Sequence, residues 1–72
     1  MAVTQRIGER IRKLRSTRGI SQEVLAHLAD LDRTYVNSVE NGRRNISIEN
    51  IEKLAKALDV TLRSFFDDDV FS

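Results

Sequence analysis

The side chains of this sequence best suited to recognition chemistry are hydrogen-bond donors and acceptors in one short segment. The planar guanidinium group of Arg33 can donate to O6 and N7 of a guanine base at the same time. Thr34 offers a hydroxyl group for a base edge and a methyl group that suits thymine. Asn37 and Ser38 follow one helical turn later, and Tyr35 lies between the two pairs. This combination suits side chains that read base edges, although the solvated start of a helix can have the same residues.

A second polar cluster is suited to the phosphate groups of the same partner. Arg43, Arg44 and Asn45 form a run of hydrogen-bond donors. The charge distribution agrees, because residues 1–45 contain nine Lys and Arg against five Asp and Glu, and residues 46–72 contain three against six. These net charges of +4 and −3 add to the total of +1. A basic front half suits contact with a polyanion, although uneven but solvated helix faces produce the same imbalance.

Length and composition narrow the classes of function. The 72 residues predict one domain over residues 1–72, with room for about four or five short helices. Cysteine is absent and histidine occurs once, so we expect no disulfide, no metal site and no cofactor. Neither a nucleophile–base pair nor a glycine-rich phosphate loop is present, so an enzyme or a small-molecule site is not predicted. The run Asp67-Asp68-Asp69 lacks a turn glycine and is predicted to be a solvated tail.

The sequence does not predict contact with a membrane. No apolar run approaches the ~20 residues that span a bilayer. The first residues are charged throughout, unlike those of a signal peptide. We therefore expect a cytoplasmic protein.

Apolar residues at helical spacing predict five helices and no strand, which is an all-α fold. The first helix covers residues 4–18, and we expect Arg10, Arg12 and Lys13 on its solvated side. Gly8 should weaken this helix slightly. Each of the other helices follows a residue suited to cap it, and these caps are Ser21, Asp32, Ser47 and Thr61. We expect the second helix to end near Ala29, the third to cover Arg33 to Asn41, the fourth to reach Leu58 and the fifth to reach about Asp68.

The second and third of these helices have the spacing of a helix-turn-helix over residues 21–41. Ala26 supplies a small residue where the two helices touch. Asp30, four positions later, tolerates the left-handed conformation that the turn needs, although glycine is usual there. Val36 and Val39 then pin the second helix of the motif to the first. We also expect inward-facing side chains at Val24, Leu25, Leu28 and Ala29. In the fourth helix, we expect one apolar face formed by Ile48, Ile51, Leu54, Ala55 and Leu58.

These residues resemble a known family. The segments that carry the resemblance are Ser21-Gln22-Glu23-Val24-Leu25-Ala26, Leu31-Asp32-Arg33-Thr34-Tyr35-Val36, Val39-Glu40-Asn41-Gly42-Arg43-Arg44-Asn45 and Leu54-Ala55-Lys56-Ala57-Leu58-Asp59-Val60. They are similar to the Xre/Cro-repressor-like helix-turn-helix domain, over residues 5–66. The resemblance implies a five-helix, lambda-repressor-like domain that binds a double-stranded DNA operator. It also implies an ion pair between Arg15 and Glu40.

Within this family, the run from Leu31 to Val36, followed by Arg44-Asn45, is most similar to controller proteins of restriction–modification systems. Such proteins are short dimeric regulators without a ligand domain. In domains of this kind, the start of the second helix of the motif enters the major groove. We therefore predict base contacts from Arg33, Thr34, Tyr35, Asn37 and Ser38. For Tyr35, packing against the core is an equal alternative.

The predicted contacts to the DNA backbone flank the second helix of the motif, which we call the reading helix. At the start of the second helix, free N–H groups and the helix dipole favour an anion. The loop after the third helix adds further donors. The residues predicted to contact phosphate groups are Ser21, Gln22, Arg43, Arg44 and Asn45.

We predict a homodimer, because one short reading helix covers only about 3–5 base pairs. A small domain has difficulty burying two adjacent phenylalanine rings, so the last helix should supply the interface. The predicted interface residues are Leu62, Phe65, Phe66 and Val70. A contact of Glu23 with RNA polymerase is a further hypothesis.

Alternative functions stay open at this point. The leading interpretation is a sequence-specific DNA-binding transcriptional regulator of the controller type. An antitoxin-type Xre regulator without a restriction–modification partner, or a protein-interaction module, would share much of the sequence. Arg33, Arg43 and Arg44 argue against the interaction module, and an enzyme is the weakest interpretation. The sequence does not give the operator or decide between activation and repression.

Overall fold

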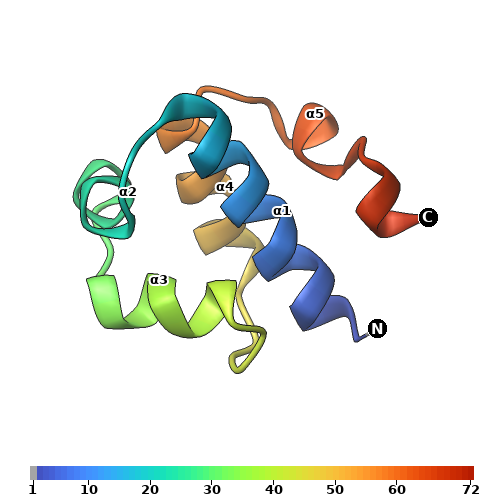
Figure 1. The fold of residues 1–72 in the computed structure, drawn as a ribbon, viewed down its shortest axis with the longest axis horizontal. Coiled ribbons are helices and arrows are strands. Elements are labelled where there is room, and N and C mark those ends of the chain that lie inside the picture. The colour runs from blue at the N-terminus through green and yellow to red at the C-terminus, as the bar shows by residue number, and fades with distance from the viewer. Residues whose placement is uncertain (1) are drawn as a thin grey trace.

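Side-chain caps begin four of the helices. In the computed structural model, which describes residues 2–72, these caps accept hydrogen bonds from backbone N–H groups two or three residues ahead, and they are Ser21, Asp32, Ser47 and Thr61. The helices are α1 (Val3–Arg18), α2 (Gln22–Ala29), α3 (Arg33–Glu40), α4 (Ile48–Ala57) and α5 (Leu62–Phe66), and a 3₁₀ turn, η1 (Asp69–Phe71), follows (Figure 1). No strand occurs within the described residues. The predicted all-α fold is confirmed.

Residues in the left-handed conformation end α1 and α2. Gly19 follows α1 with a φ of 66°, and Asp30 follows α2 with a φ of 56°. The predicted conformation of Asp30 is therefore confirmed. Asp59 has a similar φ of 59° after α4. Aspartate is one of the few residues other than glycine that adopt this conformation readily, so both turns form without glycine.

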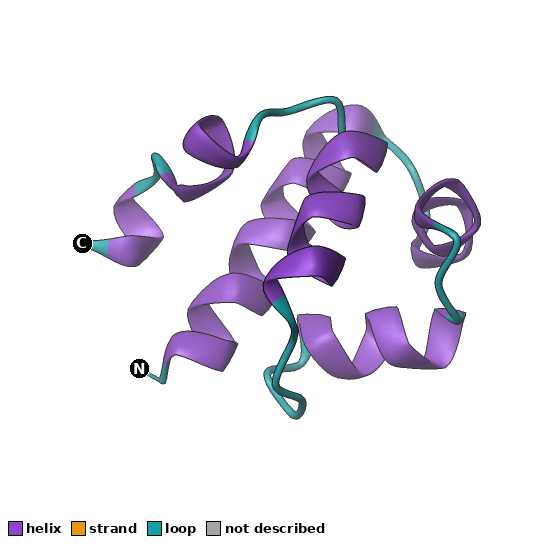
Figure 2. Cartoon of the chain, turned by 180° about the vertical axis from the view of Figure 1, so that it is seen from behind, coloured by secondary structure: helices purple, strands orange, loops and turns teal. Residues whose placement is uncertain are grey.

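Helix α1 crosses the middle of the molecule, with α2 and α3 on one side and α5 and the C-terminus on the other (Figures 1 and 2). α1 contacts both α3 and η1, while α4 packs against α2 and α5. The core therefore draws side chains from all five α-helices, and its largest fully buried members are Ile11, Leu25, Val36, Val39, Leu54, Leu58 and Phe65. Val36 and Val39 pin α3 in place, as predicted.

Three apolar residues expected in the core lie on the surface. Val24, Leu28 and Ile48 are 43%, 57% and 60% exposed. The short α2 turns Leu25, Ala26 and Ala29 inward, so Val24 and Leu28 are left on its outer flank. The prediction that Val24 and Leu28 face the core is therefore wrong, and Ile48 likewise lies outside the buried face of α4. No helix within residues 2–72 has both the length and the apolar character needed to cross a membrane.

Arg10 holds the C-terminal segment against α1. Its side chain is buried, and its Nε and Nη2 atoms each donate to a backbone oxygen, of Phe65 and Ser64 respectively, at 2.8 Å. Its Nη1 lies 3.1 Å from Asp68 Oδ1, and Lys13 Nζ lies 3.0 Å from Asp68 Oδ2. The prediction of a solvated Arg10 is therefore wrong, and that of a solvated acidic tail is wrong at Asp68, whereas Lys13 stays half-exposed as predicted. Arg10 instead satisfies carbonyl groups that the short α5 leaves open.

Helix α5 ends at Phe66, two residues before the predicted end. Phe65 is fully buried in the core, so its predicted place in an intermolecular interface is wrong. Phe66 is 39% exposed, and its ring meets that of Phe65 edge-on at 5.0 Å. Leu62 and Val70 are half-buried beside them. The domain thus buries one of the two adjacent phenylalanines and leaves the other at the surface.

Candidate nucleic-acid interface

Helix α3 presents a polar edge because its apolar side is buried. Val36 and Val39 have almost no exposed area, whereas Arg33, Thr34 and Asn37 are exposed. Asp32 fixes the start of the helix by accepting a hydrogen bond from the N–H of Thr34 at 2.7 Å. A shallow polar hollow lies at this end of the helix, and the residues that line it are Gln22, Arg33, Thr34 and Asn37. Three of the five predicted base-contacting side chains therefore share one accessible edge.

Tyr35 and Ser38 lie on the flank of α3. Tyr35 is half-buried against the core, and its hydroxyl oxygen accepts a hydrogen bond from Asn50 Nδ2 at 3.0 Å. The guanidinium carbon of Arg44 lies 4.9 Å from the centre of the tyrosine ring, in a cation–π contact. Ser38 is also half-buried, and its backbone oxygen accepts from the N–H of Arg43 at 3.0 Å. Tyr35 thus packs against the core and also positions a loop arginine.

The loop after α3 extends the same edge of the molecule (Figure 1). Arg43, Arg44 and Asn45 are all exposed. Within residues 2–72, neither the loop arginines nor Arg33 forms an ion pair. Their positive charges are therefore available to an anion.

The N-terminus of α2 lies beside this edge. Ser21 Oγ caps the helix by accepting from the N–H of Val24 at 3.1 Å. The side-chain amide of Gln22 is already hydrogen-bonded within the protein, since it donates to Glu40 and accepts from Asn37, both at 3.0 Å. An anion at this end of α2 would therefore meet backbone N–H groups rather than the Gln22 amide.

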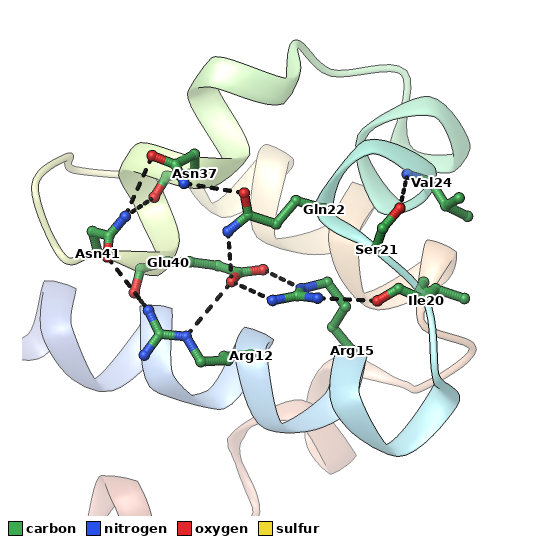
Figure 3. Close-up of polar contacts among 9 residues, drawn as sticks. All are labelled: Arg12, Arg15, Ile20, Ser21, Gln22, Val24, Asn37, Glu40 and Asn41. Atoms are coloured by element: carbon green, nitrogen blue, oxygen red, sulfur yellow. Dashed lines mark hydrogen bonds and ion pairs between the residues drawn. The ribbon is translucent and has the colours of Figure 1, made fainter.

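Arg15 and Glu40 form the ion pair that the resemblance implies (Figure 3). The distances are 2.7 Å from Arg15 Nε to Glu40 Oε2 and 3.0 Å from Arg15 Nη2 to Glu40 Oε1. The carboxylate is fully buried and the arginine side chain is 20% exposed. These hydrogen bonds raise the pKa of Arg15 above its ordinary value. The pair joins the last turns of α1 and α3 and so fixes the reading helix on the core.

Two polar residues, Arg12 and Asn50, support α3 without any signal in the sequence. Arg12 Nη2 donates to the backbone oxygen of Glu40 at 3.1 Å and lies 3.5 Å from Asn41 Oδ1. Arg12 is half-exposed, as expected, but these contacts also tie it to the end of α3. Asn50 reaches Tyr35 from α4. Such contacts join residues far apart in the chain, and no local pattern of residue types indicates them.

Comparisons with known proteins agree with this arrangement. A family model described as helix-turn-helix matches residues 11–65. Control protein C.MunI of Mycoplasma sp is 47% identical over 64 residues, which cover 88% of this chain and 86% of the relative. Control protein C.BamHI of Bacillus amyloliquefaciens is 46% identical over 61 residues, covering 83% and 75% respectively. The chain belongs to the controller proteins of the helix-turn-helix family.

The fold of this controller protein matches solved structures of the same family. The restriction–modification controller protein C.AhdI from Aeromonas hydrophila superposes with a TM-score of 0.87 at 52% identity, covering 92% of this chain and all of that one. C.Esp1396I bound to a 25 base pair operator site superposes with a TM-score of 0.87 at 34% identity, covering 93% and 88%. The predicted family and the five-helix fold are therefore confirmed.

The remaining predicted contact residues of the controller protein do not line the polar hollow at the start of α3. Glu23 is exposed in the first turn of α2. Leu62, Phe66 and Val70 lie in or beside α5, across α1 from α2 and α3 (Figure 2). The structure therefore separates the candidate DNA-binding edge from the surface predicted to form the dimer.

Proposed function

We propose that this controller protein is a homodimeric, sequence-specific transcriptional regulator. It binds a pseudo-palindromic operator and regulates its own gene and the neighbouring genes of a restriction–modification system. The single observation that carries this proposal is the edge formed by α3 and the following loop, where three arginines without ion-pair partners adjoin the exposed Thr34 and Asn37. The similarity to C.Esp1396I, whose structure contains an operator site, supports it.

The proposed contacts divide by chemistry. Arg33, at the first position of α3, donates to a guanine edge in the major groove. Thr34, Asn37 and Ser38 complete the reading edge, and the rim of Tyr35 borders it.

Phosphate groups on either side of the groove are bound from two places. Arg43, Arg44 and Asn45 donate from the loop, and the cation–π contact with Tyr35 restricts the freedom of Arg44. Ser21 and the backbone N–H groups at Gln22 bind a phosphate at the start of α2. These contacts fix the orientation of α3 without selecting a base.

A dimer follows from the short reading helix. The proposed interface consists of Leu62, Phe66 and Val70, and Phe65 supports it from the core. Such an interface uses the same patch on both protomers around a two-fold axis. The two α3 helices would then read half-sites about 34 Å apart on one face of the duplex.

Glu23 is the proposed contact for RNA polymerase, because it is exposed on α2 and outside the reading edge. The test is a Glu23→Ala variant, measured for DNA binding and for transcription in a reporter assay. We expect normal binding with reduced activation. Normal binding together with normal regulation would contradict this role.

The proposed function is tested by duplex binding at several salt concentrations. We expect operator affinity that exceeds affinity for scrambled DNA by about 10³-fold or more. The logarithm of the affinity should fall linearly with the logarithm of salt concentration between about 50 and 200 mM. Arg18→Ala, which removes an exposed arginine of α1, is the matched control and should behave like the unmodified chain. A chain that binds no duplex even at low salt would instead be a protein-interaction module.

A further inference from the structure

The buried carboxylate of Glu40 determines which way its amide neighbour points. A carboxylate accepts hydrogen bonds and cannot donate them. Its oxygens face Arg15 at 2.7 and 3.0 Å, Gln22 Nε2 at 3.0 Å and Arg12 Nε at 3.7 Å (Figure 3). Gln22 must therefore turn its NH₂ group toward Glu40, because its oxygen would meet another acceptor there.

The orientation of the Gln22 side-chain amide determines the orientation of the Asn37 amide on α3. With its nitrogen committed to Glu40, Gln22 offers Oε1 on its other side, where Asn37 Nδ2 donates at 3.0 Å. Asn37 therefore places its NH₂ group toward α2 and its oxygen away from it. Asn37 is exposed, so this order of donor and acceptor is presented at the surface.

The guanidinium group of Arg12 fixes the same orientation of the Asn37 amide from the opposite side. Arg12 can only donate, so Asn41 turns its oxygen toward Arg12, with 3.5 Å between Nη2 and Oδ1. Asn41 Nδ2 then faces Asn37, at 2.9 Å from the backbone oxygen and 3.3 Å from Oδ1. We call the closed set of Arg12, Gln22, Asn37, Glu40 and Asn41 the amide ring. Its two charged members impose one direction on the Asn37 amide.

We infer that Asn37 is a specificity-determining residue that selects adenine over guanine because the amide ring fixes its direction. Adenine presents an acceptor at N7 and a donor at N6, which an asparagine amide matches with its nitrogen and its oxygen. Guanine presents acceptors at both N7 and O6. An amide free to rotate could donate to O6, whereas a fixed amide meets O6 with its own oxygen. This inference rests on the proposed function, and it makes Gln22 a positioning residue for Asn37 rather than a side-chain contact to phosphate.

The experiment begins with selection of bound sites from a pool of random duplexes. The Asn37→Ala variant identifies the base pair in each half-site whose preference depends on Asn37. Dissociation constants are then measured with A·T or G·C at that base pair, for the unmodified chain and for Gln22→Met, which is similar in shape but lacks the amide. His27→Gln, which changes an exposed residue of α2 outside the amide ring, is the matched control.

We expect the unmodified chain and the control to prefer adenine by roughly 5- to 150-fold, the range of one good pair of base contacts. Gln22→Met should bring this ratio close to one, while the preference at the base pair read by Arg33 stays the same. A thermal unfolding curve checks that the variant is folded. Asn41→Ala breaks the amide ring from the other side, leaves the Arg15–Glu40 pair intact and should have the same effect.

The possible outcomes separate the inference from the proposed function. An unmodified chain that selects no consensus overturns the proposed function. A clear consensus with an unchanged adenine-to-guanine ratio in Gln22→Met and Asn41→Ala overturns the inference alone. Equal weakening of all duplexes by Gln22→Met also overturns it, because that result identifies Gln22 as a phosphate contact.

Discussion

Gly8 of α1 lies directly against the backbone of α3 at Val39. A Cβ atom on Gly8 would overlap the carbonyl oxygen of Val39 and would lie 2.6 Å from that of Glu40. The backbone of α1 therefore touches the last turn of the reading helix directly. Only glycine leaves room for this crossing.

The crossing predicts that Gly8→Ala destabilises the protein. Helix propensity alone predicts the opposite, since alanine is the better helix former by roughly 0.5–1 kcal/mol. Because the clash is with backbone atoms, which cannot rotate away, we expect a loss of about 1–3 kcal/mol in the free energy of unfolding. Urea unfolding measures it, and Ser16→Ala at an exposed position of α1 is the control for propensity. A Gly8→Ala protein more stable than the unmodified chain would show that the helices do not cross this closely.

The Arg15–Glu40 pair should contribute far more to stability than the exposed Arg18–Asp59 pair at the end of α1. Arg15→Ala leaves the buried carboxylate of Glu40 without its main partner, and we expect a loss of about 3 kcal/mol or more. Arg18 and Asp59 lie 3.7 Å apart with 45% and 87% of their side chains exposed. Arg18→Ala should therefore cost less than about 1 kcal/mol. Equal losses in the two variants, measured by chemical unfolding, would contradict this ranking.

Local patterns predict the helices, their caps and the left-handed turn at Asp30, because each depends on residues close together in the chain. The same patterns identify Arg33, Thr34 and Asn37 as exposed polar residues of α3. The partner of Glu40 comes from a resemblance and not from any local pattern.

Contacts between distant segments account for what the sequence does not predict. The sequence predicts that Arg10 is a solvated charge on α1. It is instead buried by a segment more than fifty residues later in the chain, as its hydrogen bond to the backbone oxygen of Phe65 shows. Phe65 and Phe66 are the same residue type in adjacent positions, and only the path of α5 decides which ring enters the core. The need for glycine at residue 8 likewise depends on α3 and not on its own helix.

Substitution of the two phenylalanines should therefore affect different properties, stability for Phe65 and dimer formation for Phe66. Phe65→Ala opens a cavity in the core, and we expect a loss of about 3–5 kcal/mol in the free energy of unfolding. Phe66→Ala should leave the fold intact but raise the dimer dissociation constant by about tenfold or more. Chemical unfolding and sedimentation equilibrium measure the two effects. A purely monomeric unmodified chain at tens of micromolar, with and without DNA, would rule out the proposed dimer.

The C-terminal segment should stay docked until the solution is more acidic than the ordinary aspartate pKa. The hydrogen bond from the N–H of Val70, followed by that from Lys13, lowers the pKa of Asp68 below its usual value of 3.8. A lowered pKa in the folded state means that the stabilisation is present above the unfolded value and is lost as the pH falls through the folded value. The difference in unfolding free energy between the unmodified chain and Asp68→Asn should be constant from about pH 5 to 8 and should shrink below about pH 4. A difference that grows in acid would reverse the predicted sign.

In the proposed complex with DNA, α3 reads bases while the following loop holds phosphates. The most direct test compares affinity for operator and scrambled duplexes at several salt concentrations, for Arg33→Ala and Arg44→Ala. Arg33→Ala should cost about 1–3 kcal/mol on the operator and relax the preference at one base pair in each half-site. Arg44→Ala should weaken both duplexes about equally and reduce the salt slope by about one per protomer, because a phosphate group is the same at every base pair. Equal weakening of both duplexes by Arg33→Ala, together with loss of discrimination in Arg44→Ala, would contradict the proposed roles.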